Sequence, residues 1–131
     1  MQKDLNEARQ FFAGDRYAVE ATGCVIDAVG ERYARCSLTL APHHYNAVGQ
    51  VMGGVSFTLA DFAFAVAANF HQGLTVSVTS SISHLGTVKG SRLIAQTRLI
   101  KDGRRNCFYE VDVTDDLDNP IALVTITGAH I

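Results

Sequence analysis

The chain contains 131 residues, 47% of them hydrophobic, and carries a formal net charge of −2. This length and apolar content suit one domain, spanning residues 1–131, with a substantial core. The small negative charge excludes the basic surface of a nucleic-acid-binding protein. The sequence has no run of about 18 apolar residues, so no membrane-spanning helix is expected.

The first segment, over about residues 3–13, has apolar residues at helical spacing, and Gly14 is expected to end this short helix. Its charged residues differ from the apolar centre of a secretory signal. The cysteines lie far apart in apolar segments and form no C-x-x-C pair: Cys24, Cys36 and Cys107. We therefore expect reduced core thiols, a cytoplasmic location and no metal site.

Two extended segments follow, from Ala21 to Val29 and from Arg32 to Leu40, with a tight turn at Gly30-Glu31 between them. Polar and apolar residues alternate in the second segment, which is the pattern of a half-buried strand. The two segments therefore predict a β-hairpin, and Pro42 ends its second strand.

The stretch from Asn46 to Asn69 begins with a glycine-rich loop and continues as the longest segment with helical periodicity. Apolar residues cover every side of this predicted helix, so we expect it to be buried. Asp61 is the one ionisable residue within it. A carboxylate on a buried helix is costly unless it is paired, hydrogen-bonded or exposed to a wet cleft. Asp61 therefore indicates a functional site.

Four further strands are predicted after the helix. In the first, Val76, Val78 and Ile82 are expected on one face and hydroxyl residues on the other. Asp102-Gly103 predicts a type I′ hairpin between the second and third strands. The strands are expected over Thr75–Leu85, Ser91–Lys101, Asn106–Thr114 and Ile121–Ile131. The layout is α+β: an antiparallel β-sheet wrapped around a long central α-helix, the hotdog fold.

One motif spans the loop and the start of the central helix, N-x-x-G-x-x-x-G-G-x-x-x-x-L-A-D. Its residues are Asn46, Gly49, Gly53, Gly54, Leu59, Ala60 and Asp61. The motif resembles the signature of hotdog-fold acyl-CoA thioesterases of the phenylacetate-degradation (PaaI-like) type. The similarity runs over about residues 15–131.

This resemblance implies an enzyme that hydrolyses an acyl-CoA thioester to free acid and CoA. Asp61 would act as general base or nucleophile, and Asn46 would position the attacking water or the substrate. Gly53 would donate its backbone N–H to the thioester oxygen. A hydroxyl group on the next strand would assist, and both Thr79 and Ser80 fit that description. No cofactor is expected, because coenzyme A is part of the substrate.

The chain departs from the family pattern at two places. The family usually has a histidine before the glycine pair, where this chain has Met52, and we expect Met52 and Gly54 to contact the substrate. The family's Arg-Pro-Gly-like stretch after the third strand is also missing. Lys89 and Arg92 are the candidates to replace its phosphate contact, although charged residues near a turn are more often simply solvated.

The distance between the motif residues predicts a homodimer. Thioester hydrolysis needs a base or nucleophile and a donor aimed at the developing oxyanion. Gly53 lies at the amino end of the predicted helix, where backbone N–H groups are free and the dipole is positive. Asp61 would lie about 12 Å further along the axis, too far to serve the same thioester. We therefore expect sites shared across a two-fold homodimer, possible pairing of two dimers, and no nucleic-acid or membrane partner.

Simpler interpretations stay open for each motif residue. Asp61 could be a structural carboxylate satisfied by hydroxyl groups, Gly53-Gly54 a tight turn, and Asn46 a turn residue or cap. The whole chain could be a non-catalytic acyl-CoA or small-ligand binding module of the same fold. A dehydratase of this fold would need an acid–base histidine near the helix start, and a serine hydrolase would need a G-x-S-x-G motif; the sequence has neither.

Overall fold

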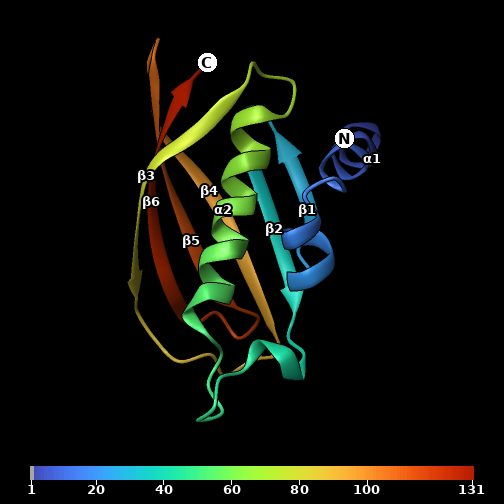
Figure 1. Ribbon diagram of the computed structural model, residues 1–131, viewed down its shortest axis with the longest axis vertical. Helices are drawn as coiled ribbons and strands as arrows, with labels where there is room; N and C mark the ends of the chain where they lie inside the picture. The colour runs from blue at the N-terminus through green and yellow to red at the C-terminus, as the bar shows by residue number, and fades with distance from the viewer. Residues whose placement is uncertain (1) are drawn as a thin grey trace.

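A six-stranded antiparallel sheet curves around one long helix in the computed structural model, which describes residues 2–131 (Figure 1). The strand order is β1-β2-β4-β5-β6-β3, so β1 and β3 form the two edges. The elements are α1 (Gln2–Phe12), the π-helical turn η1 (Tyr17–Thr22), β1 (Val25–Gly30), β2 (Tyr33–Thr39), the 3₁₀ turn η2 (Pro42–His44), α2 (Gly53–Asn69), β3 (Thr75–His84), β4 (Arg92–Asp102), β5 (Asn106–Asp115) and β6 (Pro120–His130). The predicted α+β class and hotdog architecture are confirmed.

Helix α2 forms the centre of the core because its sequence is apolar on every side. Its buried residues include Leu59, Phe62, Phe64 and Val66. The ring of Phe64 packs edge-to-face on Tyr109 of β5, with the ring centroids 5.3 Å apart. Alternate residues of the sheet complete the core: Leu93, Ala95, Val111, Val113, Val124 and Ile126. Each fully buried aliphatic side chain contributes roughly 1.5–3 kcal/mol, so α2 is held rigidly and with it the motif residues.

The first predicted strand begins later than the sequence indicated. Residues 17–22 form the π-helical turn η1, and β1 starts only at Val25. Gly23 follows the turn with φ of 88°, a left-handed conformation that glycine adopts without strain. Ala18 and Thr22 are buried, and η1 packs against α2. The prediction was wrong here because these small residues lack helical periodicity, while their burial against α2 favours the turn.

The predicted type I′ hairpin at Asp102-Gly103 is also wrong. Strand β4 continues through Asp102, and residues 103–105 connect it to β5. A type I′ turn requires positive φ at both central residues, and Gly103 does not have one. Asp102 is held in the strand because its carboxylate binds Arg32 at 2.6 Å and His130 at 2.8 Å. These long-range side-chain contacts favour the extended conformation of Asp102, and they cannot be read from the dipeptide alone.

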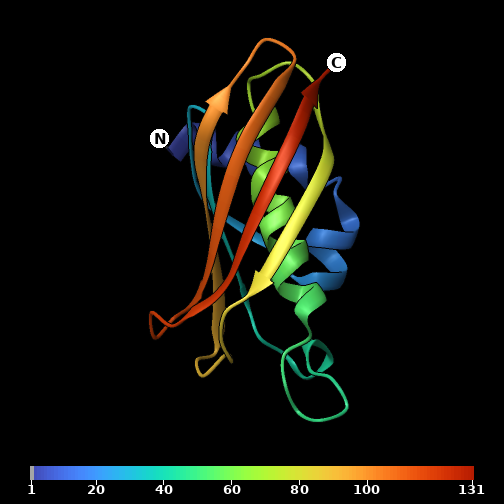
Figure 2. The ribbon, with the colours of Figure 1, turned by 90° about the vertical axis from the view of Figure 1, so that its left-hand side faces the viewer.

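Strand β3 does not bury the face that its sequence predicted. A register shift lies between Ser77 and Thr79, so Val78 falls in a β-bulge and the alternation changes phase there. Thr75 is buried, whereas Val76 is 38% and Val78 is 57% exposed. Only Ile82, beyond the bulge, packs on the core. Strand β3 forms the edge of the sheet beside β6 (Figure 2). This edge therefore carries exposed valines next to backbone groups that no neighbouring strand pairs.

The three cysteines are free and buried, as predicted, within the part of the chain that the structure describes. Burial raises the pKa of the Cys24 thiol to about 12 and raises the pKa of Cys36 and Cys107 as well. These groups are therefore inert core thiols at neutral pH. Among residues 2–131, no helix is both long and apolar enough to cross a membrane.

Candidate active site

Asp61 lies half-buried in the middle of α2 and opens on a cavity of about 470 Å³. The cavity lies between α2 and the segment around η1, and Asp15, Tyr17 and Thr58 are among its lining residues. Burial, and then the negative charge of Asp15, raise the pKa of Asp61. Within residues 2–131, no side chain donates a hydrogen bond to its carboxylate. The interpretation of Asp61 as a carboxylate satisfied by hydroxyl groups is therefore wrong for this chain.

An unpaired, partly desolvated carboxylate facing a cavity can accept a proton or attack an electrophile. Desolvation disfavours the charged form and so moves the pKa toward working pH, which makes the group a better base. The helix places Thr58, Asp61 and Ala65 on one face, at steps of three and four residues, and all three line this cavity. Asp61 is the residue on that face with acid–base chemistry.

Gly53, the first residue of α2, lines a different cavity of about 370 Å³. Gln50, Ser56, His84 and Val88 line the same space. A Cβ atom at Gly53 would lie 2.6 Å from Cε1 of His84, closer than real Cβ contacts allow. The glycine therefore leaves room for the exposed His84 ring, which would have to turn away from any side chain at this position. Its backbone N–H is one of the helix's unsatisfied amino-terminal donors.

The structure does not bring Gly53 and Asp61 together within one chain. The two cavities share no lining residue, and a helix separates the two positions by about 12 Å along its axis. A donor at Gly53 and a base at Asp61 cannot reach one carbonyl group from the same chain. This geometry is the one expected if a second copy completes each site.

Asn46 shapes the loop that precedes α2. Its side-chain oxygen accepts hydrogen bonds from the backbone N–H groups of Val48 and Gln50, both at 3.0 Å. Tyr45 and Val51 bridge the base of the loop, which projects beyond the end of α2 (Figure 2). Asn46 lines neither cavity, so in the single chain it is placed as a turn residue.

Met52 and Gly54 line a third cavity, of about 220 Å³, on the side of α2 that faces η1. Thr58 and Tyr17 line both this cavity and the Asp61 cavity, so the two spaces adjoin along the helix. Met52 is 51% exposed and supplies an apolar, flexible wall. Met52 and Gly54 therefore border a space that adjoins the Asp61 cavity.

His44 is a residue of this region that the sequence analysis treated as part of a simple connection. It is buried, and its Nδ1 accepts a hydrogen bond from the Ala41 backbone N–H at 3.0 Å. Its Nε2 therefore carries the proton that it donates to the carbonyl oxygen of Thr22 at 2.7 Å. His44 thus ties η2 to η1 beside the third cavity. No local sequence signal indicates this long-range contact.

The remaining predicted residues lie apart from the Asp61 and Gly53 cavities. Arg92 is partly buried, and its Nη2 donates to the Ser37 hydroxyl at 2.8 Å, so its charge is already engaged. Lys89 is exposed on the loop after β3. Because strand residues alternate, Ser80 shares the face of Ile82 toward α2, whereas Thr79 has the opposite phase. Of the two hydroxyl candidates, Ser80 is on the side of the helix.

Asp115 is a buried carboxylate that the sequence analysis missed. Burial alone would raise its pKa, but hydrogen bonds hold that pKa well below the usual range. The donors are the Asn119 side chain and the backbone N–H groups of Lys89, Gly90, Leu117 and Asn119. Asp115 therefore fastens the loop after β3, which forms one wall of the Gly53 cavity, to the turn before β6.

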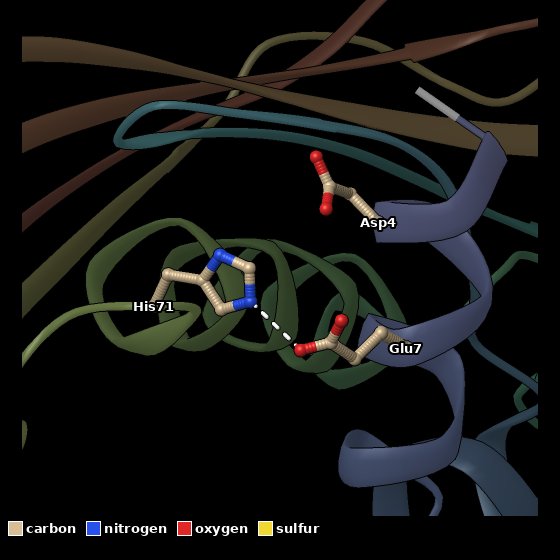
Figure 3. A group of neighbouring side chains, drawn as sticks. All are labelled: Asp4, Glu7 and His71. Carbon is tan, nitrogen blue, oxygen red and sulfur yellow. Dashed lines mark hydrogen bonds and ion pairs between the residues drawn. The ribbon is translucent and has the colours of Figure 1, made fainter.

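A cluster of Asp4, Glu7 and His71 joins α1 to the loop after α2 (Figure 3). His71 Nε2 lies 2.8 Å from Glu7 Oε1, and the three ligand-type atoms lie within 4.8 Å of one another. Glu7 and His71 are exposed, and their mutual contact already satisfies both groups. We interpret the cluster as a surface tether for α1.

A family model described as the thioesterase superfamily matches residues 48–122, from the loop before α2 into β6. The chain belongs to the thioesterase superfamily. A candidate esterase of Archaeoglobus fulgidus is 32% identical over 94 residues, which cover 71% of this chain and 61% of that protein. The chain thus spans less than two thirds of that relative's length. The acyl-coenzyme A thioesterase PaaI of Escherichia coli is 26% identical over 122 residues, 92% of this chain and 86% of that protein.

Solved structures share the fold closely. The E. coli PaaI structure superposes with a TM-score of 0.84 at 23% identity, covering 97% of this chain and 96% of that one. A Streptococcus pneumoniae thioesterase protein, solved with coenzyme A, superposes with a TM-score of 0.83 at 20% identity, covering 92% and 96%. The predicted resemblance to PaaI-like thioesterases is confirmed.

Proposed function

We propose that this protein is an acyl-CoA thioesterase that works as a homodimer, with Asp61 of one chain opposite Gly53 of the other. The observation that carries the proposal is Asp61 itself, a half-buried carboxylate that opens on a cavity of about 470 Å³ and receives no hydrogen bond from the described residues 2–131. The family supports thioester hydrolysis, and the E. coli relative is an acyl-coenzyme A thioesterase. The coenzyme A in the S. pneumoniae structure supports CoA as the leaving thiol.

The chemistry follows from these two groups. Asp61 accepts a proton from a water molecule as the water oxygen bonds to the acyl carbon, and the carbonyl oxygen becomes an oxyanion. The Gly53 N–H donates to that oxyanion at the positive end of the α2 dipole. The C–S bond then breaks, the electron pair leaves on sulfur, and the proton held by Asp61 passes to the thiolate. Free acid and CoA thiol are the products.

A second copy of the chain supplies the missing half of each site in this proposal. The β3 edge has unpaired backbone groups and exposed valines at 76 and 78, which is a surface suited to pairing with the same edge of another chain. A two-fold axis there would set two α2 helices antiparallel to each other. The carboxylate of one helix would then approach the amino terminus of the other.

Hydrolysis of a panel of acyl-CoA esters, followed with a thiol-detecting reagent, tests the proposal. We expect release of thiol by the wild-type protein and a loss of about 10²-fold or more in Asp61→Asn, whose amide can serve neither as base nor as nucleophile. Asp4→Asn is the matched control, because Asp4 lies on α1 away from the cavity. Binding of acyl-CoA without turnover would contradict the proposed hydrolytic function and favour a non-catalytic binding module.

A further inference from the structure

His84 ends β3 and lies directly against the amino terminus of α2. Measured from the position of a Cβ atom at Gly53, the nearest ring atoms are Cε1 at 2.6 Å, Nε2 at 3.0 Å and Nδ1 at 3.4 Å. The edge of the ring that carries both nitrogens therefore faces Gly53, and its carbon edge faces away. Within residues 2–131, neither nitrogen has a hydrogen-bond or ion-pair partner.

The surroundings of this imidazole form a cavity of about 370 Å³ with one polar end. Val51, Val88 and Ile121 supply apolar walls, and the open backbone donors of α2 lie at the end that His84 covers. An imidazole carries at least one N–H donor in either protonation state. Two independent donors, one from the backbone and one from a side chain, thus converge on the same end of the cavity.

We propose that His84 donates a hydrogen bond to the thioester carbonyl oxygen beside the Gly53 N–H, and so forms the second donor of the oxyanion site. This inference rests on the proposed thioesterase function. No proton is transferred by His84: it holds the oxyanion while water adds and the thiolate leaves. The role makes His84 a catalytic residue, because its N–H touches the reacting oxygen.

The backbone that carries this exposed ring is fixed on both sides of the site. His84 pairs with Ala122 in the β3–β6 ladder, and the next residue, Leu85, donates its N–H to the Ile121 carbonyl at 2.8 Å. Gly53 is fixed because α2, which it begins, is anchored in the core by Leu59, Phe62 and Val66. Donors held before the reaction stabilise developing charge without reorganisation. Met52 stands where the family usually has a histidine, and it lines a different cavity from His84.

Two variants of His84 distinguish a hydrogen-bonding role of the ring from a purely packing role. His84→Phe keeps a flat ring against Gly53 but has no donor, and His84→Gln keeps an N–H donor. For the acyl-CoA ester that the wild type hydrolyses best, we expect kcat to fall about 10–10³-fold in His84→Phe with KM little changed. We expect His84→Gln to recover part of that loss. His71→Phe, on the exposed loop after α2, is the matched control and is expected to keep wild-type kcat.

A binding measurement makes the inference independent of turnover. The probes are a CoA thioether bearing a trifluoromethyl ketone, which adds water to give a tetrahedral form, and the matching alkyl-CoA thioether without the ketone. We expect the wild type to bind the ketone more tightly than the thioether, His84→Phe to lose that preference, and His84→Gln to retain part of it.

The outcomes distinguish this inference from the proposed function. If the wild type hydrolyses no ester but its ketone preference depends on His84, the hydrolytic function fails and the donor role stands. If kcat and the ketone preference of His84→Phe equal those of the wild type, the donor role is wrong, whether or not the protein is an enzyme. Equal losses in both variants, accompanied by a lower melting temperature, would show a purely structural ring and also overturn it. A wild type that binds neither probe overturns it as well.

Discussion

Asp15 and Asp61 line the same cavity, and the charge of Asp15 adds to burial in raising the pKa of Asp61. Asp15 comes from the segment between α1 and η1, whereas Asp61 comes from α2. Burial raises the pKa of Asp15 too. Two carboxylates face one cavity and receive no side-chain hydrogen bond from the part of the chain that the structure describes, so the ionised state of Asp61 is costly. This cost has measurable consequences for stability and for activity.

Asp61→Asn is expected to stabilise the fold at neutral pH while it abolishes hydrolysis. The folded-state pKa of Asp61 is raised, so the folded state loses stability as pH rises from the unfolded pKa of about 3.9 through the folded pKa. Asparagine avoids this cost. Thermal denaturation should give a higher melting temperature for the variant at pH 7 and nearly equal values near pH 3. A lower melting temperature at pH 7 would reveal a stabilising partner for the carboxylate.

Asp15→Asn is expected to shift the pH dependence of hydrolysis. Removing the neighbouring negative charge lowers the pKa of Asp61, so the ionised base is present at lower pH. The acid limb of log kcat/KM against pH should move to lower pH, with the plateau rate little changed. Asp4→Asn serves as the control. An unmoved acid limb would mean that Asp61 is not the group whose ionisation controls the rate.

Asp115→Asn is expected to destabilise the protein by about 2–4 kcal/mol, because an amide nitrogen would oppose backbone donors that now bind a carboxylate oxygen. The folded pKa of Asp115 is depressed, so its contribution is present above the unfolded pKa of about 3.9 and is lost as pH falls through the folded pKa. Urea unfolding should be measured at pH 7 and at low pH. The difference in the free energy of unfolding between wild type and variant should become smaller at low pH.

The matched control for Asp115 is Asp118→Asn. Asp118 has φ of 64°, a conformation that asparagine tolerates. The free energy of unfolding of this variant is expected to stay within about 0.5 kcal/mol of the wild-type value. A loss at position 118 as large as that at 115 would show that the turn sequence, and not the buried hydrogen bonds, determines the stability.

Val78→Lys is expected to convert the proposed dimer into monomers. A lysine in the exposed bulge of β3 would place like charges together across a two-fold edge pairing. Sedimentation velocity should show the change in mass, and hydrolysis should fall with it. Val25→Lys is the control, since Val25 is a 47% exposed valine on the opposite edge strand. Dimers that persist in Val78→Lys would place the interface elsewhere.

Mixing two inactive variants tests whether sites are shared. Asp61→Ala removes the base, and Gly53→Ala puts a Cβ where the His84 ring lies. After subunit exchange, each heterodimer of these two chains should contain one intact site and one doubly damaged site, so activity returns. If exchange is verified by mass and no activity appears, both groups must act within one chain.

The local patterns of the sequence predicted the long helix and most of the strands, but not the turn η1 or the contacts between elements. Periodicity predicted α2 and the alternation of β2 and β5, because each pattern repeats within a few residues. Asp61 was found because a single charge interrupts an apolar helix. The bulge at Val78 was missed, since a one-residue phase change leaves the composition of a strand unaltered.

The contact between Gly53 and His84 could not be predicted in the same way. Helix α2, a loop and the whole of β3 separate the two residues in the chain. Their proximity depends on how β3 joins β6 and on where α2 begins over the sheet. The chemistry of His84 therefore becomes visible only in the folded arrangement. The same holds for Asp115, whose donors come from both its own turn and a distant loop.

Because the ring of His84 occupies the place of a side chain at position 53, the two positions constrain each other as sequences diverge. Alanine at 53 is compatible with this backbone only if residue 84 becomes smaller or turns away. A related chain with a small residue at position 84 could carry a side chain at position 53. A chain that keeps both Gly53 and His84 keeps the backbone donor and the side-chain donor together. Introducing a larger residue at position 53 while His84 is kept should therefore be tolerated less well than changing both positions together.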